Sequence, residues 1–410
     1  MQKQQLAGSR ESDVTKVAKA IGPIRAAPPV TPYLSLWARI EDLDKSRLDD
    51  ALYRERTLVR IPCMHARLYL VPVDDLAVYR RLGQDLLQPG LRDVLDLYSR
   101  ESPIDQNGDR LSVEELTRRV LEVLCARGPA TIDELTQFLP ELNIRLYHDP
   151  DHPELGHSRL GTRLLPALCA QGILVRAQPR GGWRSDFYSY SALSSWLPDA
   201  RVDGLTSGDA LQRAVRSYLA AFGPATLSDV YHWLGGYARS DVAAALMSLG
   251  RDLVRIQIAG HPHEHLILRE ELDALAEIDE PEPTLRLLPP RDSYSMAYES
   301  SWRILPEIHR ERVFDRVGES AGTVWLDGVI VGTWGVQMRE ERITVRFFEP
   351  PPPETLAMAG EEARAMGEFL EFDETDIDIG IQEDEDQDGE EEALIAKLNI
   401  NVEPWSVVEK

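Results

Sequence analysis

The sequence of 410 residues predicts an α+β protein with three tandem winged-helix units, a small β-rich C-terminal domain and a disordered acidic tail. The first reason is an internal repeat, in which two segments show the same order of three helices and a β-hairpin. The second is a change of composition after Glu277, where prolines, alternating apolar residues and finally acidic residues prevail. The predicted boundaries are 5–100 (first winged helix with a helical connector), 101–200 and 201–278 (second and third winged helices), 279–370 and 371–410.

The repeat centres on two similar stretches, RGPATIDELTQFLP at 127–140 and FGPATLSDVYHWLG at 222–235. In both, Gly-Pro ends an amphipathic helix and a threonine begins the next one. Each threonine is followed three positions later by an acidic residue, as in a capping box: Thr131 with Glu134, and Thr226 with Asp229. The second box is a weaker version of the motif, because it has aspartate where the first has glutamate. The two stretches therefore predict the same helix–turn–helix.

A third helix and a hairpin follow in both copies. The helices are predicted at 158–172 and 239–251, and the hairpins at 173–191 and 253–268, each with a strand that opens on Leu-Val-Arg. Three helices and a two-stranded wing are the winged-helix plan, in which the first two helices position the third. Residues 44–72 also read as a helix that runs into Leu-Val-Arg and a strand pair. They indicate a first, degenerate copy at roughly 10–80, with a helical connector at 74–100.

The C-terminal region predicts a different domain. A proline-rich linker at 277–292 precedes a hairpin at 322–334, which turns at Asp327-Gly328, a dipeptide that favours tight primed turns. A further strand at 342–349 and a helix at 354–370 complete a small α+β domain.

The tail carries most of the acidity of the chain. The formal net charge is −24, but residues 1–270 are close to neutral, and 13 acidic residues with no basic residue lie between Glu371 and Glu392. Such a segment predicts disorder. It either folds back on arginines of the same chain and competes with their ligand, or serves as a solubilising appendage. The acidic pI therefore says little about what the first two thirds bind.

Several classes of function lack support. No stretch approaches 18 apolar residues and the N-terminus has no hydrophobic signal segment, so a cytoplasmic location is predicted. The three dispersed cysteines read as buried thiols in a reducing compartment. No G-x-S-x-G, P-loop or dinucleotide fingerprint occurs, so neither a nucleotide nor another cofactor is predicted. Two histidine groups lack matching ligands, and no metal is predicted: His148, His152 and His157, and His261, His263 and His265.

Arginines occur where a winged helix would contact the phosphates of double-stranded DNA. Guanidinium groups suit bidentate phosphate contact, which positions a protein without specifying sequence. Alternatively, they form solvated faces and ion pairs with nearby acids. Trp183 lies in Gly-Gly-Trp at the tip of a wing, where it either reaches into a groove or packs on its own domain. The candidates from the three units are Arg39, Arg60, Arg67, Arg159, Arg163, Arg176, Arg180, Trp183, Arg184 and Arg239.

Five stretches together resemble a family of winged-helix DNA-binding proteins, the AlkZ- and YcaQ-type DNA glycosylases, which remove alkylated or crosslinked bases. The similarity runs over about 5–370. It implies tandem winged helices around a DNA-binding concavity and a β-rich C-terminal domain. The stretches are PYLSLWARI (32–40), LVRIPCMHARLYLVP (58–72), GPATLSDVYHWLGG (223–236), LRLLPPRDSYSMAY (285–298) and WLDGVIVGTW (325–334).

The chain departs from the family at both of its diagnostic sites. A Gln-aliphatic-Gln or Gln-aliphatic-Asp signature, which holds a water near the glycosidic bond, corresponds here to Arg25-Ala26-Ala27. Arginine accepts no hydrogen bond from water, and alanine has no polar side-chain atom. The family's Met-Arg-Gly-Thr-Leu-His hairpin reads Met-His-Ala-Arg-Leu-Tyr from Met64 to Tyr69, so Arg25, His65 and Tyr69 join the predicted DNA-binding residues.

Two functions remain open on these residues. One is a duplex DNA-binding protein without catalysis, on the glycosylase scaffold. The other is an active DNA glycosylase for alkylated or crosslinked bases that uses non-standard residues. Its base would be recruited from elsewhere, and the candidates are Asp42, Asp292 and His65.

Overall fold

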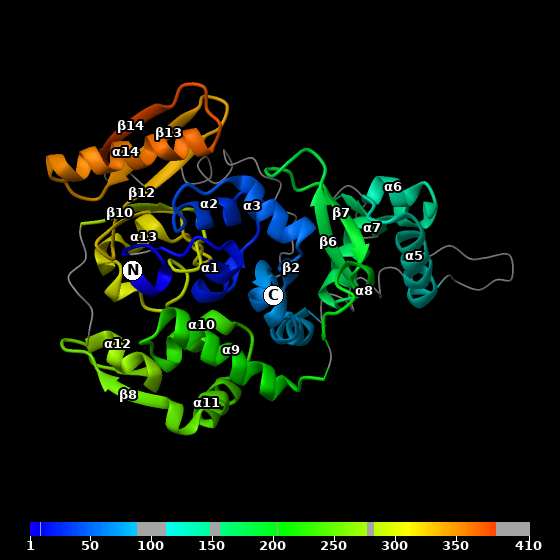
Figure 1. Cartoon of the computed structure of the whole chain (residues 1–410), viewed down its shortest axis with the longest axis horizontal. Helices are drawn as coiled ribbons and strands as arrows, with labels where there is room; N and C mark the ends of the chain where they lie inside the picture. The colour runs from blue at the N-terminus through cyan, green and yellow to red at the C-terminus, as the bar shows by residue number, and fades with distance from the viewer. Residues whose placement is uncertain (9, 88–111, 148–155, 203, 277–282, 383–410) are drawn as a thin grey trace, which may run out of the picture. The chain divides into compact units, whose positions relative to one another are not determined.

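A computed structural model describes residues 1–8, 10–87, 112–147, 156–202, 204–276 and 283–382. It is a mixed α+β structure with several small sheets (Figure 1). The chain forms two compact units, each built from separate stretches. Unit 1 comprises Met1–Leu43, Val215–Leu234 and Val242–Lys410, and unit 2 comprises Asp44–Ala214 and Gly235–Asp241. None of the described helices is long and apolar enough to cross a membrane.

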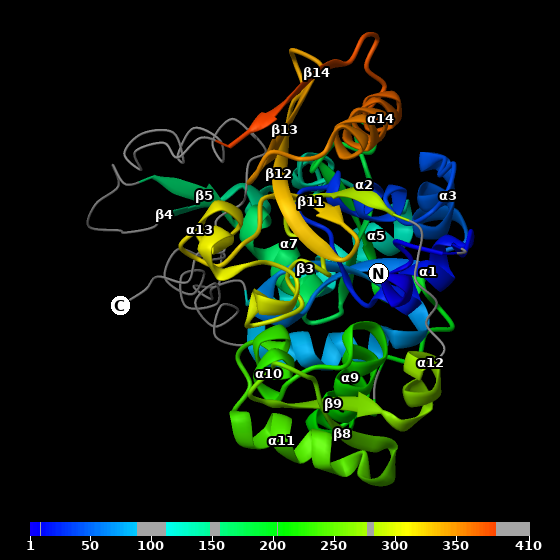
Figure 2. The same ribbon diagram turned by 90° about the vertical axis from the view of Figure 1, so that its left-hand side faces the viewer.

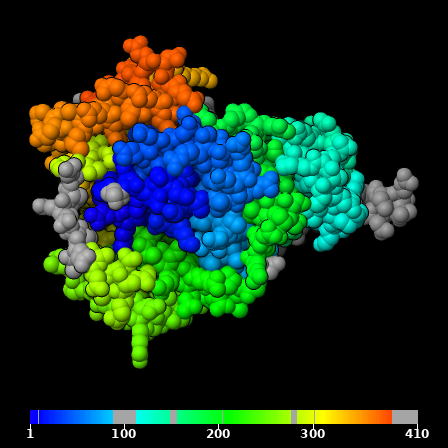
Figure 3. All heavy atoms as spheres, in the orientation of Figure 1, coloured from blue at the N-terminus to red at the C-terminus, as the bar shows by residue number. Residues whose placement is uncertain are grey.

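A five-stranded sheet forms the C-terminal part of unit 1. Its order is β10-β11-β12-β13-β14, antiparallel from β10 to β13, with β14 parallel to β13. Helix α14 packs against β10, β13 and β14 (Figure 2), and its opposite side lies at the surface, in orange in Figure 3. The bounds are β10 Leu285–Leu288, β11 Gly322–Leu326, β12 Val329–Gln337, β13 Arg342–Phe347, α14 Pro353–Phe369 and β14 Asp376–Ile381.

The elements predicted for this region are confirmed. The hairpin β11–β12 turns at Asp327 and Gly328, both with positive φ (50° and 92°), which is the backbone of a primed turn. Apolar side chains that alternate along β13 are buried together with small residues of α14, among them Ile343, Val345 and Ala363.

Strand β14 corrects the predicted tail. Disorder was expected from Glu371 onward, but Asp376–Ile381 pairs in register with β13. The strand alternates aspartate and isoleucine, and Ile379 lies near Gly360 of α14, where an added Cβ would be 3.9 Å from its Cδ1 atom. The aspartates instead form ion pairs with β13, Asp376 with Arg342 and Asp378 with Arg346, each with an N···O distance of 2.6 Å. The rest of the acidic run, 383–392, lies outside the described residues.

Two glycines of β12 predict opposite responses to alanine. A Cβ at Gly332 would lie 2.3 Å from the carbonyl oxygen of Arg346 on β13, whereas a Cβ at Gly335 would meet nothing within 4 Å. We expect Gly332→Ala to lower the free energy of unfolding by about 1–3 kcal/mol, because the β13 backbone must move. Gly335→Ala, on the same strand, should be neutral or stabilising. Urea unfolding of the two variants checks this, and equal stabilities would contradict it.

The remaining elements of unit 1 are mostly short. Helix α2 begins at Thr31 with Pro32 in its first turn, where a missing N–H costs nothing. The bounds are α1 Val14–Ile21, β1 Ile24–Arg25, α2 Thr31–Trp37, α10 Leu227–Leu234, β8 Leu253–Gln257, β9 Glu264–Leu268, α12 Leu272–Ala276 and α13 Arg310–Val313. Helices α9 (Ser207–Phe222) and α11 (Arg239–Ser248) contribute residues to both units.

Unit 2 holds the repeat copy that contains residues 127–140, and the β2–β3 hairpin. Its buried cluster joins α5, α6 and α7 through leucines such as Leu116, Leu135 and Leu164. Residues 76–87, part of the predicted connector, are helical, while 88–100 lie outside the described residues. The bounds are α3 Lys45–Asp49, β2 Leu58–Pro62, β3 Leu68–Pro72, α5 Val113–Arg127, α6 Ile132–Thr136, β4 Arg145–Tyr147, β5 His157–Arg159, α7 Leu160–Ala170, β6 Leu174–Pro179, β7 Tyr188–Ala192 and α8 Leu193–Trp196.

The repeat is confirmed in its order and in its contacts. In both copies the threonine hydroxyl accepts a hydrogen bond from the backbone N–H of the acidic residue, at 3.2 Å in the first and 3.1 Å in the second. The backbone N–H of the threonine in turn donates to the carboxylate of the acidic residue. A residue just before each box also bridges to the second strand of its hairpin, Ala130 with Tyr190 and Ala225 with Leu266. Helix, helix, helix, hairpin is therefore present twice. That the chain contains three winged-helix units stays a prediction.

Candidate nucleic-acid interface

The segment predicted to correspond to the family signature, residues 25–27, lies in unit 1 and is mostly buried. Arg25 ends the short strand β1 and is 8% exposed, and Ala26 is fully buried. The Arg25 Nη2 atom donates to Oε1 of Glu319 at 3.0 Å. The other oxygen of this carboxylate accepts a hydrogen bond from Nε of Arg291. One carboxylate therefore joins two guanidinium groups at this place.

Glu319 is held at the end of a tight turn, 315–319. The Asp315 side chain accepts the backbone N–H groups of Val317 (2.9 Å) and Glu319 (2.8 Å), and the Asp315 N–H donates to the Glu319 carbonyl at 3.0 Å. Aspartate side chains commonly organise turns in this way. The Glu319 backbone is thus fixed, while its side chain reaches Arg25.

Three consecutive residues anchor the signature segment from the β10 side. Arg291 contacts Glu319, Asp292 contacts α2, and the Ser293 hydroxyl donates to the Pro23 carbonyl at 2.5 Å. Arg291 has a φ of 61°, which is uncommon for a residue with a side chain. Its N–H is fixed by both the carbonyl and the hydroxyl of Ser320, each at 3.1 Å. Residues 23–25 are therefore held by contacts with residues that are far away in the sequence.

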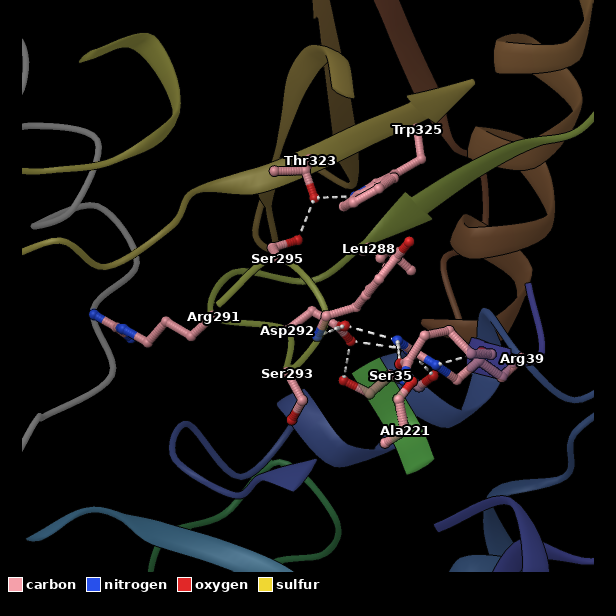
Figure 4. A network of polar contacts seen from close by, with 12 residues as sticks. Ser35, Arg39, Ala221, Leu288, Arg291, Asp292, Ser293, Ser295, Thr323 and Trp325 are labelled. Carbon is pink, nitrogen blue, oxygen red and sulfur yellow. Dashed lines mark hydrogen bonds and ion pairs between the residues drawn. The ribbon is translucent and has the colours of Figure 1, made fainter. Parts of the chain in front are cut away.

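Asp292 forms a buried ion pair with Arg39 (Figure 4). Arg39 donates to Oδ1 at 2.7 Å and to Oδ2 at 2.9 Å, in a bidentate arrangement, and Ser35 Oγ donates to Oδ2 at 2.7 Å. The Arg39 side chain is 0% exposed and also bonds the carbonyls of Ser35 and Gln4. A guanidinium group so enclosed cannot contact DNA, so the prediction for Arg39 is corrected to a structural role. The same geometry removes Asp292 from the candidate bases.

Arg60 is also an interior residue of unit 2. It is 2% exposed and donates to the hydroxyl of Tyr53, and its guanidinium carbon lies 5.5 Å from the ring centroid of Tyr188. Burial raises the pKa of Tyr53, and the Arg60 charge opposes that rise. Arg60 therefore stabilises the core beside β6–β7, which corrects its assignment to DNA. Arg176 lies over the same Tyr188 ring, at 5.2 Å, and is half-buried.

The tip of the β6–β7 hairpin gathers an aromatic ring and two cations. Gly181 and Gly182 have φ of 93° and 89°, which lets the chain turn sharply before Trp183. The Arg184 guanidinium carbon lies 4.7 Å and the Lys45 ammonium 5.1 Å from the centre of the Trp183 ring. Trp183 is half-buried and Arg184 exposed. Lys45 was missed in the sequence because it precedes this tip by more than 100 residues.

Two predicted arginines already pair with acids of α6. Arg159 contacts Asp133 at 2.6 Å and Arg180 contacts Glu134 at 2.9 Å. The backbone N–H of Thr131 lowers the pKa of Glu134, and Arg180 lowers it further, so this carboxylate stays ionised at neutral pH. Nearby, Arg163 Nε donates to the Ser158 hydroxyl at 3.0 Å. Contact with phosphate at these arginines therefore has to compete with internal partners.

The other candidates of unit 2 are dispersed. His65 is exposed in the turn between β2 and β3, and its ring lies against Gly235. Arg67 is half-buried, Tyr69 is 8% exposed and Arg239 is exposed at the start of α11. Among the described residues, no group of three His, Cys, Asp or Glu side chains is arranged to hold a metal ion, and His148 and His152 lie outside them.

Known proteins are similar to this chain over most of its length. The fold is similar to the solved structure of the Streptomyces sahachiroi DNA glycosylase AlkZ, with a TM-score of 0.68 and 20% identity, over 92% of this chain and 96% of that one. No curated protein sequence matches the chain. The sequence profile of the AlkZ-like DNA glycosylases matches residues 18–369. The chain therefore belongs to the AlkZ-like DNA glycosylase family, a family of DNA-repair proteins.

Proposed function

We propose that this chain is a duplex DNA-binding protein of the AlkZ-like family that does not release bases. The observation that carries the proposal is the ion pair between Arg25 and Glu319, at the position predicted to correspond to the family's water-holding signature. The side chains of Arg25 and Glu319 are only 9% and 17% exposed. The pair fills the place where the reaction would need a water.

The chemistry of glycosidic hydrolysis supports this proposal. A water must be oriented by a hydrogen-bond acceptor, and charge must be stabilised on the sugar. Arginine only donates, and the alanines at 26 and 27 offer no side-chain acceptor. Glu319 accepts from two guanidinium groups, which compete with any water for its oxygens.

The proposed DNA contacts are the predicted residues that the fold leaves at least partly accessible, together with Arg25 and Tyr69. Arg39 and Arg60 are left out because both are buried in structural contacts. Lys45 is added because it shares the Trp183 ring with Arg184. The proposed set is Arg25, Lys45, His65, Arg67, Tyr69, Arg159, Arg163, Arg176, Arg180, Trp183, Arg184 and Arg239.

Glu319 also supports a second candidate, an active glycosylase with a relocated carboxylate. Glu319 is in direct contact with the residue that replaces the signature, so a movement of Arg25 would leave a carboxylate beside that place. A carboxylate there would orient water as an acceptor. In this case the base comes from residue 319 instead of residues 25–27.

Base release and binding are measured on the same duplex to separate these functions. The full chain is titrated into a labelled duplex with one alkylated purine, followed by fluorescence anisotropy, and the products are then analysed for free base. We expect saturable binding and no release above the level without protein. Release that Glu319→Gln abolishes would establish the second candidate, and no binding to any duplex would overturn both.

A further inference from the structure

We infer that Arg25 and Arg291 form a binding site for one phosphate of DNA, and that the Glu319 carboxylate occupies it in this structure. The inference rests on the proposed binding of duplex DNA and adds to it a site, a second arginine and an internal competitor. It differs from the predicted contacts because Arg291 and Glu319 were not among them.

The two arginines converge on one anion. Arg25 Nη2 reaches Oε1 of the carboxylate at 3.0 Å, and Arg291 Nε reaches Oε2. A phosphodiester carries one negative charge on two non-bridging oxygens, so it offers the same pair of acceptors. Guanidinium groups donate charge-assisted hydrogen bonds to the oxygens of carboxylates and of phosphates alike. The arrangement that holds Glu319 thus suits a phosphate.

The site is built before any phosphate arrives. The Arg291 backbone keeps its uncommon φ of 61° through two hydrogen bonds to Ser320. The segment ahead of Arg25 is held by Ser293 at the Pro23 carbonyl. Non-glycine residues at positive φ persist where their surroundings fix them, and they cluster at functional sites. The cations therefore need little reorganisation to accept a new anion.

Partial burial makes the replacement of the Glu319 carboxylate by a phosphate energetically significant. The side chains of Arg25, Arg291 and Glu319 are 9%, 20% and 17% exposed, so water screens their attraction less than at an open surface. Glu319 is fixed by its backbone in the turn 315–319, but its side chain rotates about three bonds. It can leave the arginines while the turn stays closed. The carboxylate thus sets the affinity of the site, because a phosphate must displace it.

Glu319→Gln tests the inference, because it removes the competing charge and keeps the shape and one acceptor. We expect about fivefold tighter binding of an unmodified duplex by anisotropy at low salt. Asp376→Asn is the matched control: it removes the same charge from an exposed pair with Arg342 and should leave affinity unchanged. Thermal unfolding of each variant shows that it is folded.

The gain in affinity for duplex that Glu319→Gln gives must also depend on Arg25 and Arg291. In an Arg25→Ala background, Glu319→Gln should give no gain, and Arg291→Ala alone should weaken binding and lower the salt slope by about one. Unchanged or weaker binding by Glu319→Gln, or an equal gain without Arg25, would overturn the inference while the wild-type chain still binds duplex. If the wild-type chain binds no duplex, the proposed function fails as well. Should Glu319→Gln not fold, the Arg291→Ala result decides.

Discussion

Replacing Asp292 with alanine is expected to destabilise unit 1 by about 3–5 kcal/mol, because it leaves the Arg39 charge buried without a partner. Arg39 is 0% and Asp292 1% exposed, and the carboxylate accepts from Arg39 twice, from Ser35 and from the N–H of Tyr294. Urea unfolding followed by tryptophan fluorescence measures the loss. Because the chain has more than one unit, its unfolding need not be a single transition. The wild type and the variant are therefore compared by the same fluorescence signal, without assigning one free energy of unfolding to the whole chain.

Two controls separate this buried pair from ion pairs in general. Asp376→Ala breaks an exposed pair with Arg342 and should have a much smaller effect, because water screens it. Replacing both buried partners by apolar residues, Arg39→Met with Asp292→Leu, should recover much of the stability lost in Asp292→Ala. A mild effect of Asp292→Ala, comparable to that of Asp376→Ala, would contradict the role assigned to the pair.

The largest loss of DNA affinity is expected from the double variant Trp183→Ala with Arg184→Ala. It removes an aromatic face and a cation from the β6–β7 tip, where the ring is bordered by Arg184 at 4.7 Å and Lys45 at 5.1 Å. Stacking of an accessible base on an aromatic ring is worth about 1–3 kcal/mol, so affinity should fall by at least about fivefold. Anisotropy titrations at two salt concentrations measure the change and its salt dependence.

Arg54→Ala controls for charge alone. Arg54 also lies in unit 2, its side chain is 79% exposed, and it belongs to no predicted contact set. It should change affinity little. An equal loss in Arg54→Ala would show that the tip acts only through net charge, and full affinity in the double variant would remove the tip from the interface.

Local features of the sequence predicted much of the fold. The two capping boxes, the Asp-Gly turn and the alternating strands depend on residues within a few positions of one another, and all of them occur as expected. Strand β14 was missed because the acidic composition of the tail outweighed its period-two alternation. Asp-Ile-Asp-Ile at 376–379 was the signal that could have identified it.

The site could be predicted only in part, because its contacts join distant segments. Asp292 lies 253 residues from Arg39, and Glu319 lies 294 residues from Arg25. No periodicity distinguishes an arginine that faces solvent from one that meets such a partner. Arg39 did carry a weak signal, since it stands among the apolar residues of 33–40. The stretch Arg291-Asp292-Ser293 lies within residues 285–298, one of the segments that resemble the family, but only the fold shows the separate role of each residue.

The parallel pairing of β14 has a practical consequence for removing the acidic tail. Ending the chain at residue 370 would delete β14 together with the acids and open the hydrogen-bonding edge of β13. Exposed edges recruit further strands, so such a truncation would invite aggregation that has nothing to do with charge. Ending it after Gln382 keeps the edge closed and Arg342 and Arg346 paired. Only that shorter deletion isolates what the acidic residues contribute.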